Sequence, residues 1–270
     1  MDSIGVVQGR ENRMPVNNIE IRTENLTKIY GTLTALDNLN VEVERGYIFG
    51  YLGPNGSGKT TTVRLLSGLL RPTSGTATLC GYDIVSDLKK VKAVTGILPE
   101  TPGLYTKLSA VEFLEFIGAL YDVEKEKLHE RIMKILSILG LEDRQDDLLD
   151  SYSSGMKQKV LVASTLIHEP KIVFLDEPTA YLDPSTSVLV KDIILTLAKE
   201  TGTTFFICTH MIDFAEKVCD KIGLLKAGKL MTVGTVQEIV EKSKTQNLEE
   251  AYLKIMGEEN AIEGILDWRG

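Results

Sequence analysis

The segment that decides the fold reads Gly53-Pro54-Asn55-Gly56-Ser57-Gly58-Lys59-Thr60. It matches the pattern G-x-x-x-x-G-K-[ST], and it lies between an apolar run of strand length, residues 47–52, and a stretch of helical character. The glycines let successive backbone N–H groups converge on an anion, and the following helix adds the positive end of its dipole. We therefore predict a phosphate loop in which Lys59 reaches the β- and γ-phosphates of a nucleotide, Thr60 coordinates Mg²⁺ and Thr61 contacts an α-phosphate. The alternative, a glycine-rich turn with a solvated lysine, is disfavoured by the matching strand and helix.

A buried strand that ends in two carboxylates supplies the second half of the predicted site. Residues 172–175 are apolar and are followed by Asp176 and Glu177. At the carboxyl edge of an open α/β sheet, where ligands bind, Asp176 is expected to hold magnesium directly or through water. Glu177 is expected to face the γ-phosphate and to polarise the attacking water as a general base. The alternative for such a pair is a helix N-cap or a solvated turn, and the phosphate loop in the same chain favours the catalytic interpretation.

Apolar runs of strand length alternate with longer helical stretches, as expected for an α/β domain with a largely parallel sheet. Residues 94–98 and 203–208 are also apolar on successive positions, which suits strands covered on both faces. Residues 19–30 and 36–44 alternate more and are rich in turn residues, so a small antiparallel sheet is predicted at the start. Residues 221–233, with an Ala-Gly pair in the middle, predict a closing hairpin.

Residues 101–167 carry helical patterns only and are predicted to form an insertion in the α/β core. Ser109 and Glu112 have the spacing of a capping box at the start of a helix over residues 110–121. A second helix stops at Gly140, a usual C-terminal residue. Its predicted apolar face consists of Leu128, Ile132, Ile135 and Leu139.

The chain divides into three predicted parts. Residues 1–17 lack the apolar region and the cleavage pattern of a signal peptide, so a disordered leader is expected. Residues 18–240 are predicted to be the main domain, with the helical insertion inside it. Residues 241–270 are predicted to be a C-terminal helical tail in which Asn247 caps an amphipathic helix. Docking at a dimer interface and capping of the core are both open roles for this tail.

Composition narrows the class of protein. The chain has 270 residues, with 30 Lys and Arg against 38 Asp and Glu, so its formal net charge is −8 and nucleic acid is not expected as a partner. Cys80, Cys208 and Cys219 form no CxxC pair, which opposes a disulfide framework and a zinc site. His129 and His168 are expected to be solvated. Because the sequence has no apolar run of about 18 residues, we expect a cytosolic protein that does not cross a membrane itself.

A third motif connects these features to a known family. The sequence Tyr152-Ser153-Ser154-Gly155-Met156-Lys157-Gln158 resembles the signature motif of the ATP-binding subunits of ATP-binding cassette (ABC) transporters, and the resemblance extends over residues 19–240. It implies a P-loop NTPase (RecA-like) core with an N-terminal antiparallel β subdomain and an inserted α-helical subdomain. By itself the segment also fits an ordinary Ser-Ser helix cap. Ser154 and Met156 depart from the usual glycine and glutamine, whereas Ser153 and Gly155, the main contacts, are kept.

The resemblance implies a dimer that binds ATP between its subunits. In the family, the signature motif of one subunit caps the nucleotide that the phosphate loop of another subunit holds, so two subunits enclose two Mg·ATP. Ser153 supplies a hydroxyl donor, and Gly155 lies where the first N–H groups of a helix point outward. Asp183 resembles part of the loop that crosses the dimer interface, although Ala180 and Tyr181 depart from the usual start of that loop.

Three more residues stand at positions that correspond to functional residues of the family. Tyr30 resembles the aromatic residue that stacks on adenine, although a tyrosine near a strand end is by itself more often plain packing. His210 resembles the histidine that contacts the γ-phosphate and orders the catalytic water, so Lys59, Glu177 and His210 form the expected catalytic set. Glu100 stands where the family generally has a glutamine. It keeps an oxygen ligand for Mg²⁺ and loses the amide donor.

The resemblance also implies a function. The leading interpretation is an ATPase that works as a homodimer, or as a heterodimer with a related subunit, and passes conformational change through its helical subdomain to separate transmembrane permease subunits. Residues 98–100 and 103–105 resemble the branch that partners export-type (ABC-2-like) membrane subunits. The chain is therefore expected in the cytoplasm, at the inner face of the cell membrane. A soluble assembly-factor ATPase and a low-turnover nucleotide-binding regulatory subunit are the alternatives.

Overall fold

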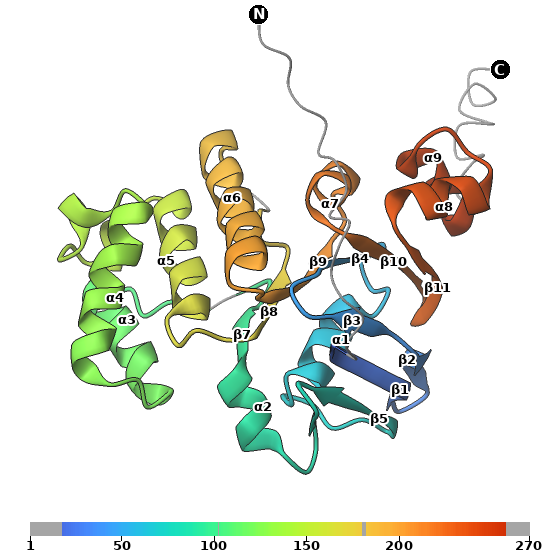
Figure 1. Cartoon of the computed structure of the whole chain (residues 1–270), viewed down its shortest axis with the longest axis horizontal. Helices are drawn as coiled ribbons and strands as arrows, with labels where there is room; N and C mark the ends of the chain where they lie inside the picture. The colour runs from blue at the N-terminus through green and yellow to red at the C-terminus, as the bar shows by residue number, and fades with distance from the viewer. Residues whose placement is uncertain (1–17, 102, 180–181, 258–270) are drawn as a thin grey trace, which may run out of the picture.

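The computed structural model describes residues 18–101, 103–179 and 182–257. The predicted leader, the departures Ala180 and Tyr181, and the last part of the predicted tail lie outside the described residues. Figure 1 shows a group of helices at one end of the described part, two β-sheets in the middle, and a pair of short helices at the other end.

The larger sheet has six strands in the order β11-β10-β4-β9-β8-β7. Its strands are β4 (Ile48–Leu52), β7 (Thr95–Leu98), β8 (Ile172–Asp176), β9 (Thr204–Thr209), β10 (Lys221–Lys226) and β11 (Lys229–Gly234). Neighbouring strands from β10 to β7 are parallel, and β11 pairs antiparallel with β10. Every residue of β4, β8 and β9 is buried, which explains why these runs are continuously apolar. The four predicted strands of this sheet and the closing hairpin are confirmed.

The smaller sheet is built around β1 (Ile19–Tyr30). Antiparallel partners of β1 are β2 (Leu33–Leu39), β3 (Glu42–Glu44) and β5 (Ser74–Leu79), and β6 (Tyr82–Asp83) pairs with β5. The antiparallel sheet is confirmed, but the single run predicted over residues 36–44 is two strands. The Asn40 side chain accepts a hydrogen bond from the Asn25 N–H and donates one to the Asn38 carbonyl, and Asn38 has a φ of 50°. The bond to Asn38 is local and turns the chain between β2 and β3, and the bond from Asn25 ties this turn to β1.

The helices that connect the core strands are α1 (Lys59–Leu66), α2 (Leu88–Val94), α6 (Pro184–Glu200) and α7 (Ile212–Val218). The predicted insertion contains α3 (Ala110–Leu120), α4 (Lys125–Ile138), two 3-10 turns, η1 (Glu142–Arg144) and η2 (Leu149–Ser151), and α5 (Ser154–Leu166). Helices α3, α4 and α5 share a hydrophobic cluster of their own. In Figure 1 they lie together at one end, beside α6. Leu136, which is fully buried in α4, adds to the predicted apolar face of this helix.

The predicted capping box at the start of α3 is present, because Ser109 accepts from the Glu112 N–H and Glu112 accepts from the Ser109 N–H. We expect Ser109→Ala to lower the free energy of unfolding by about 1 kcal/mol, since an orphan N–H loses its partner. Urea denaturation measures the change. Ser137→Ala on the exposed surface of α4 is the matched control and is expected to change stability by less than about 0.5 kcal/mol. Equal effects of the two substitutions would contradict the role of the cap.

His168 joins the helical insertion to the core. Its ring stacks on Tyr121 with the ring centres 3.6 Å apart, and its Nε2 lies 3.0 Å from the carbonyl oxygen of Thr95 at the start of β7. Burial lowers the pKa of His168. The prediction that this histidine is solvated is therefore wrong, because its surroundings come from segments far away in the sequence.

The C-terminal helices α8 (Val236–Ser243) and α9 (Leu248–Met256) follow the hairpin. Asn247 caps α9 as predicted, since its side chain accepts from the Glu250 N–H. Buried residues of α9 share a cluster with residues of β10, α7 and β4: Leu52, Ala215, Ile222, Leu224, Leu248, Ala251 and Met256. This part of the tail therefore caps the core.

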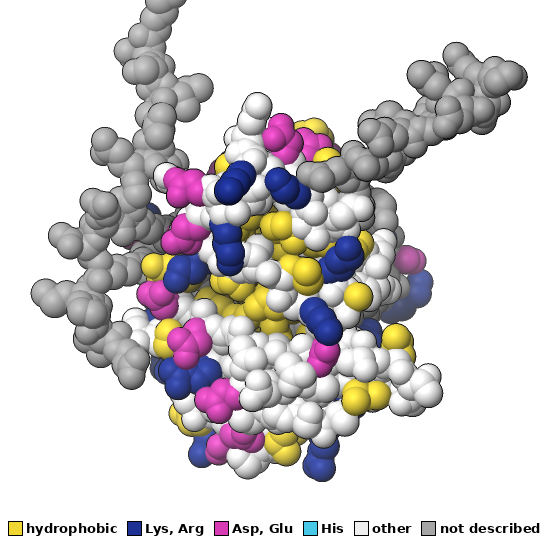
Figure 2. Space-filling view, turned by 90° about the vertical axis from the view of Figure 1, so that its right-hand side faces the viewer, with side chains coloured by type: hydrophobic (Ala, Val, Ile, Leu, Met, Phe, Trp, Pro, Cys, Tyr) yellow, Lys and Arg dark blue, Asp and Glu magenta, His cyan; other side chains and the backbone are white. Residues whose placement is uncertain are grey.

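Hydrophobic side chains are concentrated in one area of the face on the side of the C-terminal helices. Figure 2 shows hydrophobic side chains gathered in a central hollow, with lysine and arginine side chains around it. On the edge strand β11, Met231 and Val233 are exposed. Within the described ranges, no helix has both the length and the apolar character needed to span a bilayer.

Candidate nucleotide-binding site

The loop over residues 53–58 connects β4 to α1. Gly56 and Gly58 have positive φ angles of 77° and 111°, which glycine adopts readily and other residues do not. A Cβ atom on Gly58 would lie 2.5 Å from the carbonyl oxygen of Ala35. The loop therefore needs glycine for its backbone conformation and for its close packing against β2.

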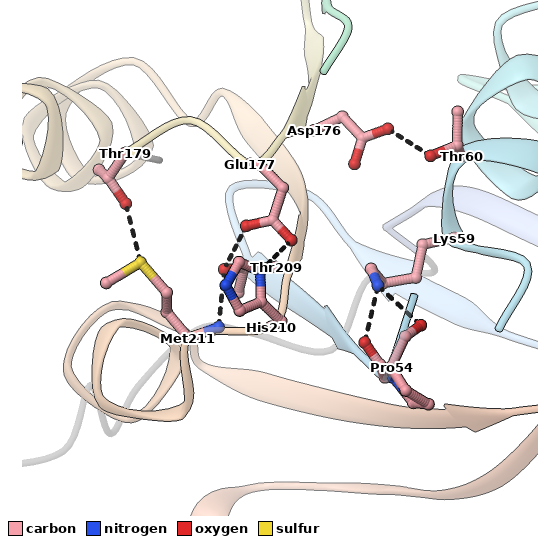
Figure 3. Close-up of polar contacts among 10 residues, drawn as sticks. Pro54, Lys59, Thr60, Asp176, Glu177, Thr179, Thr209, His210 and Met211 are labelled. Carbon is pink, nitrogen blue, oxygen red and sulfur yellow. Dashed lines mark hydrogen bonds and ion pairs between the residues drawn. The ribbon is translucent and has the colours of Figure 1, made fainter. Parts of the chain in front are cut away.

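Lys59, the first residue of α1, is only 7% exposed. Its Nζ donates to the carbonyl oxygens of Gly53 at 2.7 Å and Pro54 at 3.2 Å, so the side chain braces the loop from inside (Figure 3). An ammonium group has three N–H donors, and these two bonds leave one for an anion. Lys59 is thus placed to meet a phosphate group.

Thr60 and Asp176 bring α1 and the end of β8 together. The Thr60 hydroxyl donates to Asp176 Oδ2 over 2.8 Å. The pKa of Asp176 is raised above its ordinary value, mainly by burial. The hydrogen bond from Thr60 lowers this pKa, whereas the negative charges of Glu100 and Glu177 raise it further. A hydroxyl and a carboxylate in contact, with further negative charge nearby, fit Mg²⁺, which takes few protein oxygens and completes its shell with water and phosphate oxygens.

A metal at this place would need ligands from a bound nucleotide as well. Among the residues that the structure describes, no group of three or more His, Cys, Asp or Glu side chains could hold a metal ion. The site is therefore suited to a metal–phosphate complex and differs from a closed protein cage.

Glu177 has a positive φ of 52°, a backbone conformation that costs free energy for a residue other than glycine. Its N–H donates to the Cys208 carbonyl over 2.9 Å, which ties the loop after β8 to β9. The side chain is 11% exposed, and each carboxylate oxygen has a partner (Figure 3). Oε1 lies 2.8 Å from His210 Nδ1, and Oε2 accepts from the Thr209 hydroxyl over 3.0 Å. The carboxylate is held in one orientation beside Asp176.

One cleft of about 670 Å³ unites most of the predicted site. Its lining comes from segments far apart in the sequence: Tyr30, Leu33, Thr34, Ala35, Asn55, Gly56, Gly58, Lys59, Thr60, Thr61, Glu100, Asp176, Glu177 and Ala227. Tyr30 is 43% exposed, and the Lys28 Nζ lies 5.1 Å from its ring centre. An aromatic face, a phosphate loop and three carboxylates thus line one space, a combination that suits a nucleotide whose phosphates carry a metal ion.

Comparison with known proteins agrees with this geometry. Residues 36–180 match the ABC transporter family. The chain belongs to this family. The bacitracin transport ATP-binding protein BcrA of Bacillus licheniformis is 38% identical over 211 residues, which cover 78% of this chain and 68% of that protein. The Nod factor export ATP-binding protein I of Cupriavidus metallidurans is 34% identical over 232 residues, which cover 86% of this chain and 76% of that protein.

Solved structures of ABC proteins have the same fold. An ATP-binding subunit of an ABC transporter superposes with a TM-score of 0.81 at 27% identity, covering 87% of this chain and 98% of that chain. A dimeric ATP-binding cassette in a post-hydrolysis state with ADP and Pi superposes with a TM-score of 0.73 at 26% identity, covering 80% of this chain and 98% of that chain. The predicted P-loop fold is confirmed, and the chain is an ATP-binding ATPase of the ABC family.

Residues of the ABC signature motif lie outside the cleft. Ser153 is the N-cap of α5, and its hydroxyl accepts from the Met156 N–H over 3.3 Å. Asp183 is the N-cap of α6, where hydroxyl and N–H groups of the following turn hold its pKa well below the usual range. A Cβ atom on Gly155 would lie 3.1 Å from Asp183 Oδ2, so the two motifs are neighbours. Ser153, Gly155 and Asp183 thus form a second group, separate from the phosphate loop of the same chain.

Two polar residues near Glu177 make contacts that were not predicted, namely Gln158, the last residue of the signature-like motif, and Thr209. Gln158 of α5 donates to the Pro178 carbonyl over 3.2 Å, next to Glu177. Thr209 binds Glu177 directly. The place of Thr209, immediately before His210 at the end of a predicted strand, is the one sequence signal that points to it.

Proposed function

We propose that this chain is the motor subunit of an ABC transporter, which binds Mg·ATP, dimerises around two such nucleotides and drives separate membrane subunits by ATP hydrolysis. The observation that carries the proposal is the single cleft in which Lys59, Thr60, Asp176 and Glu177 meet. We assign residues 18–240 to the ATP-binding domain, with residues 101–167 as its helical subdomain.

Each part of the cleft has a role that its chemistry supports. The N–H groups of residues 53–58 and the start of α1 cradle the phosphates, and Lys59 adds a positive charge to them. Thr61 contacts the α-phosphate, and Tyr30 stacks on the adenine ring. Because these groups converge on one ligand, nucleotide binding depends on all of them.

Thr60 and Asp176 would hold Mg²⁺, with Glu100 as a further oxygen donor. When bound, the cation offsets the charge of the β- and γ-phosphates and orients them for attack. The contact between the Thr60 hydroxyl and Asp176 means that the two oxygens already lie side by side.

Glu177 acts as the general base that accepts a proton from the attacking water, and His210 contacts the γ-phosphate. When the carboxylate is ionised, the His210 Nδ1–H donates to Oε1. The ring of His210 is 59% exposed, so it has room to turn toward a nucleotide.

Dimerisation completes the site, because Ser153, Gly155 and Asp183 lie outside the cleft of their own chain. In the proposed dimer, these residues meet the nucleotide that the partner subunit's phosphate loop holds. The proposed place of the dimer is the cytoplasmic face of the membrane, on separate permease subunits. Export is the proposed direction, since relatives named for bacitracin transport and Nod factor export are among the similar proteins.

Steady-state ATP hydrolysis against protein concentration tests the proposal. We expect the rate per subunit to rise with concentration toward a plateau, because one chain supplies only part of each site. Lys59→Ala is the negative control and is expected to lower the rate of hydrolysis by at least about a hundredfold, because it removes the positive charge that contacts the phosphates.

The protein concentrations must extend from below to above the dissociation constant of the dimer. A rate per subunit that stays constant over this range would contradict a site shared between two subunits. Tight Mg·ATP binding without hydrolysis, both alone and with the membrane partner, would instead identify a regulatory subunit. Full activity in the absence of any membrane partner in the cell would favour a soluble assembly factor.

A further inference from the structure

Thr209 is the last residue of β9 and is 1% exposed. Its Oγ1 lies 3.0 Å from Glu177 Oε2 and 3.0 Å from the backbone nitrogen of Met211 (Figure 3). A backbone N–H can only donate, so Oγ1 accepts from Met211, and an ionised carboxylate can only accept, so Oγ1 donates its own proton to Glu177. The direction of both hydrogen bonds is therefore fixed, and Thr209 is a donor to the carboxylate.

The two partners of the Glu177 carboxylate differ in how firmly they are held. His210 is largely exposed, whereas Thr209 lies in a central strand and is anchored by Met211. If His210 turns to the nucleotide, Oε1 is released and Thr209 still binds Oε2. The carboxylate then keeps its orientation while one oxygen is free to accept a proton.

We propose that Thr209 is a positioning residue for ATP hydrolysis, which fixes Oε2 so that Oε1 of Glu177 faces the attacking water. This inference rests on the proposed role of Glu177 as the general base. The Glu177 N–H bond to Cys208 already ties the backbone of Glu177 to β9, and the Thr209 hydroxyl extends this tie to the side chain. Loss of the hydroxyl lets the carboxylate rotate, which lowers the fraction of molecules in the reactive geometry.

Thr209→Val removes the hydroxyl and keeps the shape of the side chain. We expect kcat to fall about tenfold or more, while the Kd for Mg·ATP changes by less than about twofold. Thr209→Ser keeps the donor and is expected to retain at least about half of the wild-type kcat. Hydrolysis under saturating ATP and equilibrium binding of a fluorescent ATP analogue give the two quantities.

Thr204→Val is the matched control for the loss of a buried hydroxyl. Thr204 begins the same strand, is fully buried, and accepts from the Gly46 N–H over 2.8 Å, as Thr209 does from Met211. We expect it to lower the melting temperature as much as Thr209→Val does and to leave kcat unchanged. Equal loss of kcat in the two variants, or wild-type kcat in folded Thr209→Val, would overturn the proposal.

The Glu177→Gln background separates this inference from the proposed function. If Thr209 acts through Glu177, adding Thr209→Val to Glu177→Gln lowers the single-turnover rate no further, whereas a full second decrease would overturn the inference. Wild-type hydrolysis by Glu177→Gln would remove the base role, and the positioning role with it. An inactive Glu177→Gln beside a fully active Thr209→Val would remove the positioning role alone.

Discussion

Replacement of Glu177 by glutamine is expected to lower kcat for ATP hydrolysis about a hundredfold or more, because an amide cannot take the proton from the attacking water. The Kd for Mg·ATP is expected to change by less than about threefold, since the phosphate loop, Thr60 and Asp176 are unchanged. The fold is expected to persist, because the amide can accept from His210 and donate to the Thr209 oxygen.

The same substitution is expected to make an ATP-dependent dimer long-lived. A nucleotide that is bound and not hydrolysed keeps both halves of the shared site occupied, so gel filtration with Mg·ATP should show a dimer for Glu177→Gln and mainly monomer for the wild type. Glu216→Gln, on the exposed surface of α7, removes the same charge and is the control for net charge. A monomer with unchanged turnover would exclude Glu177 as the base.

Local sequence patterns predict the parts of this fold whose causes are local. The loop over residues 53–60 and the capping box of Ser109 and Glu112 are confirmed because a few neighbouring residues determine each of them. Strands β4, β8 and β9 are equally clear, since burial on both faces requires continuous apolar residues.

Features that depend on contacts between distant segments are not predicted. Strand β5 is short and polar in sequence, and its pairing with β1 is what makes it a strand. His168 is partly buried only because Tyr121 and Thr95 meet it from other elements. The role of Thr209 likewise depends on the side chain of Glu177, 32 positions earlier. In the site, residue types with a defined spacing are predictable, and the residues that orient them are not.

Gly58→Ala is expected to abolish nucleotide binding at physiological ATP concentrations, with a rise in the Kd for Mg·ATP of at least about a hundredfold. The added Cβ would lie 2.5 Å from the Ala35 carbonyl oxygen, and the φ of 111° is unfavourable for alanine. The loop must move to relieve this contact, and then its N–H groups no longer converge on the phosphates. Strain and overpacking are also expected to lower the free energy of unfolding by about 2–4 kcal/mol.

Gly81→Ala separates the effect of backbone strain from that of the loop. Gly81 has a φ of 81° in the turn between β5 and β6, and a Cβ there meets no atom within 4 Å. We expect it to lower the free energy of unfolding by about 1 kcal/mol and to leave the Kd for Mg·ATP unchanged. Isothermal titration calorimetry and urea denaturation of both variants give the comparison. Wild-type affinity of Gly58→Ala for ATP would contradict this prediction. It would mean that Ala35 shifts to make room for the added methyl group, and that phosphate binding does not depend on the close packing of the loop against β2.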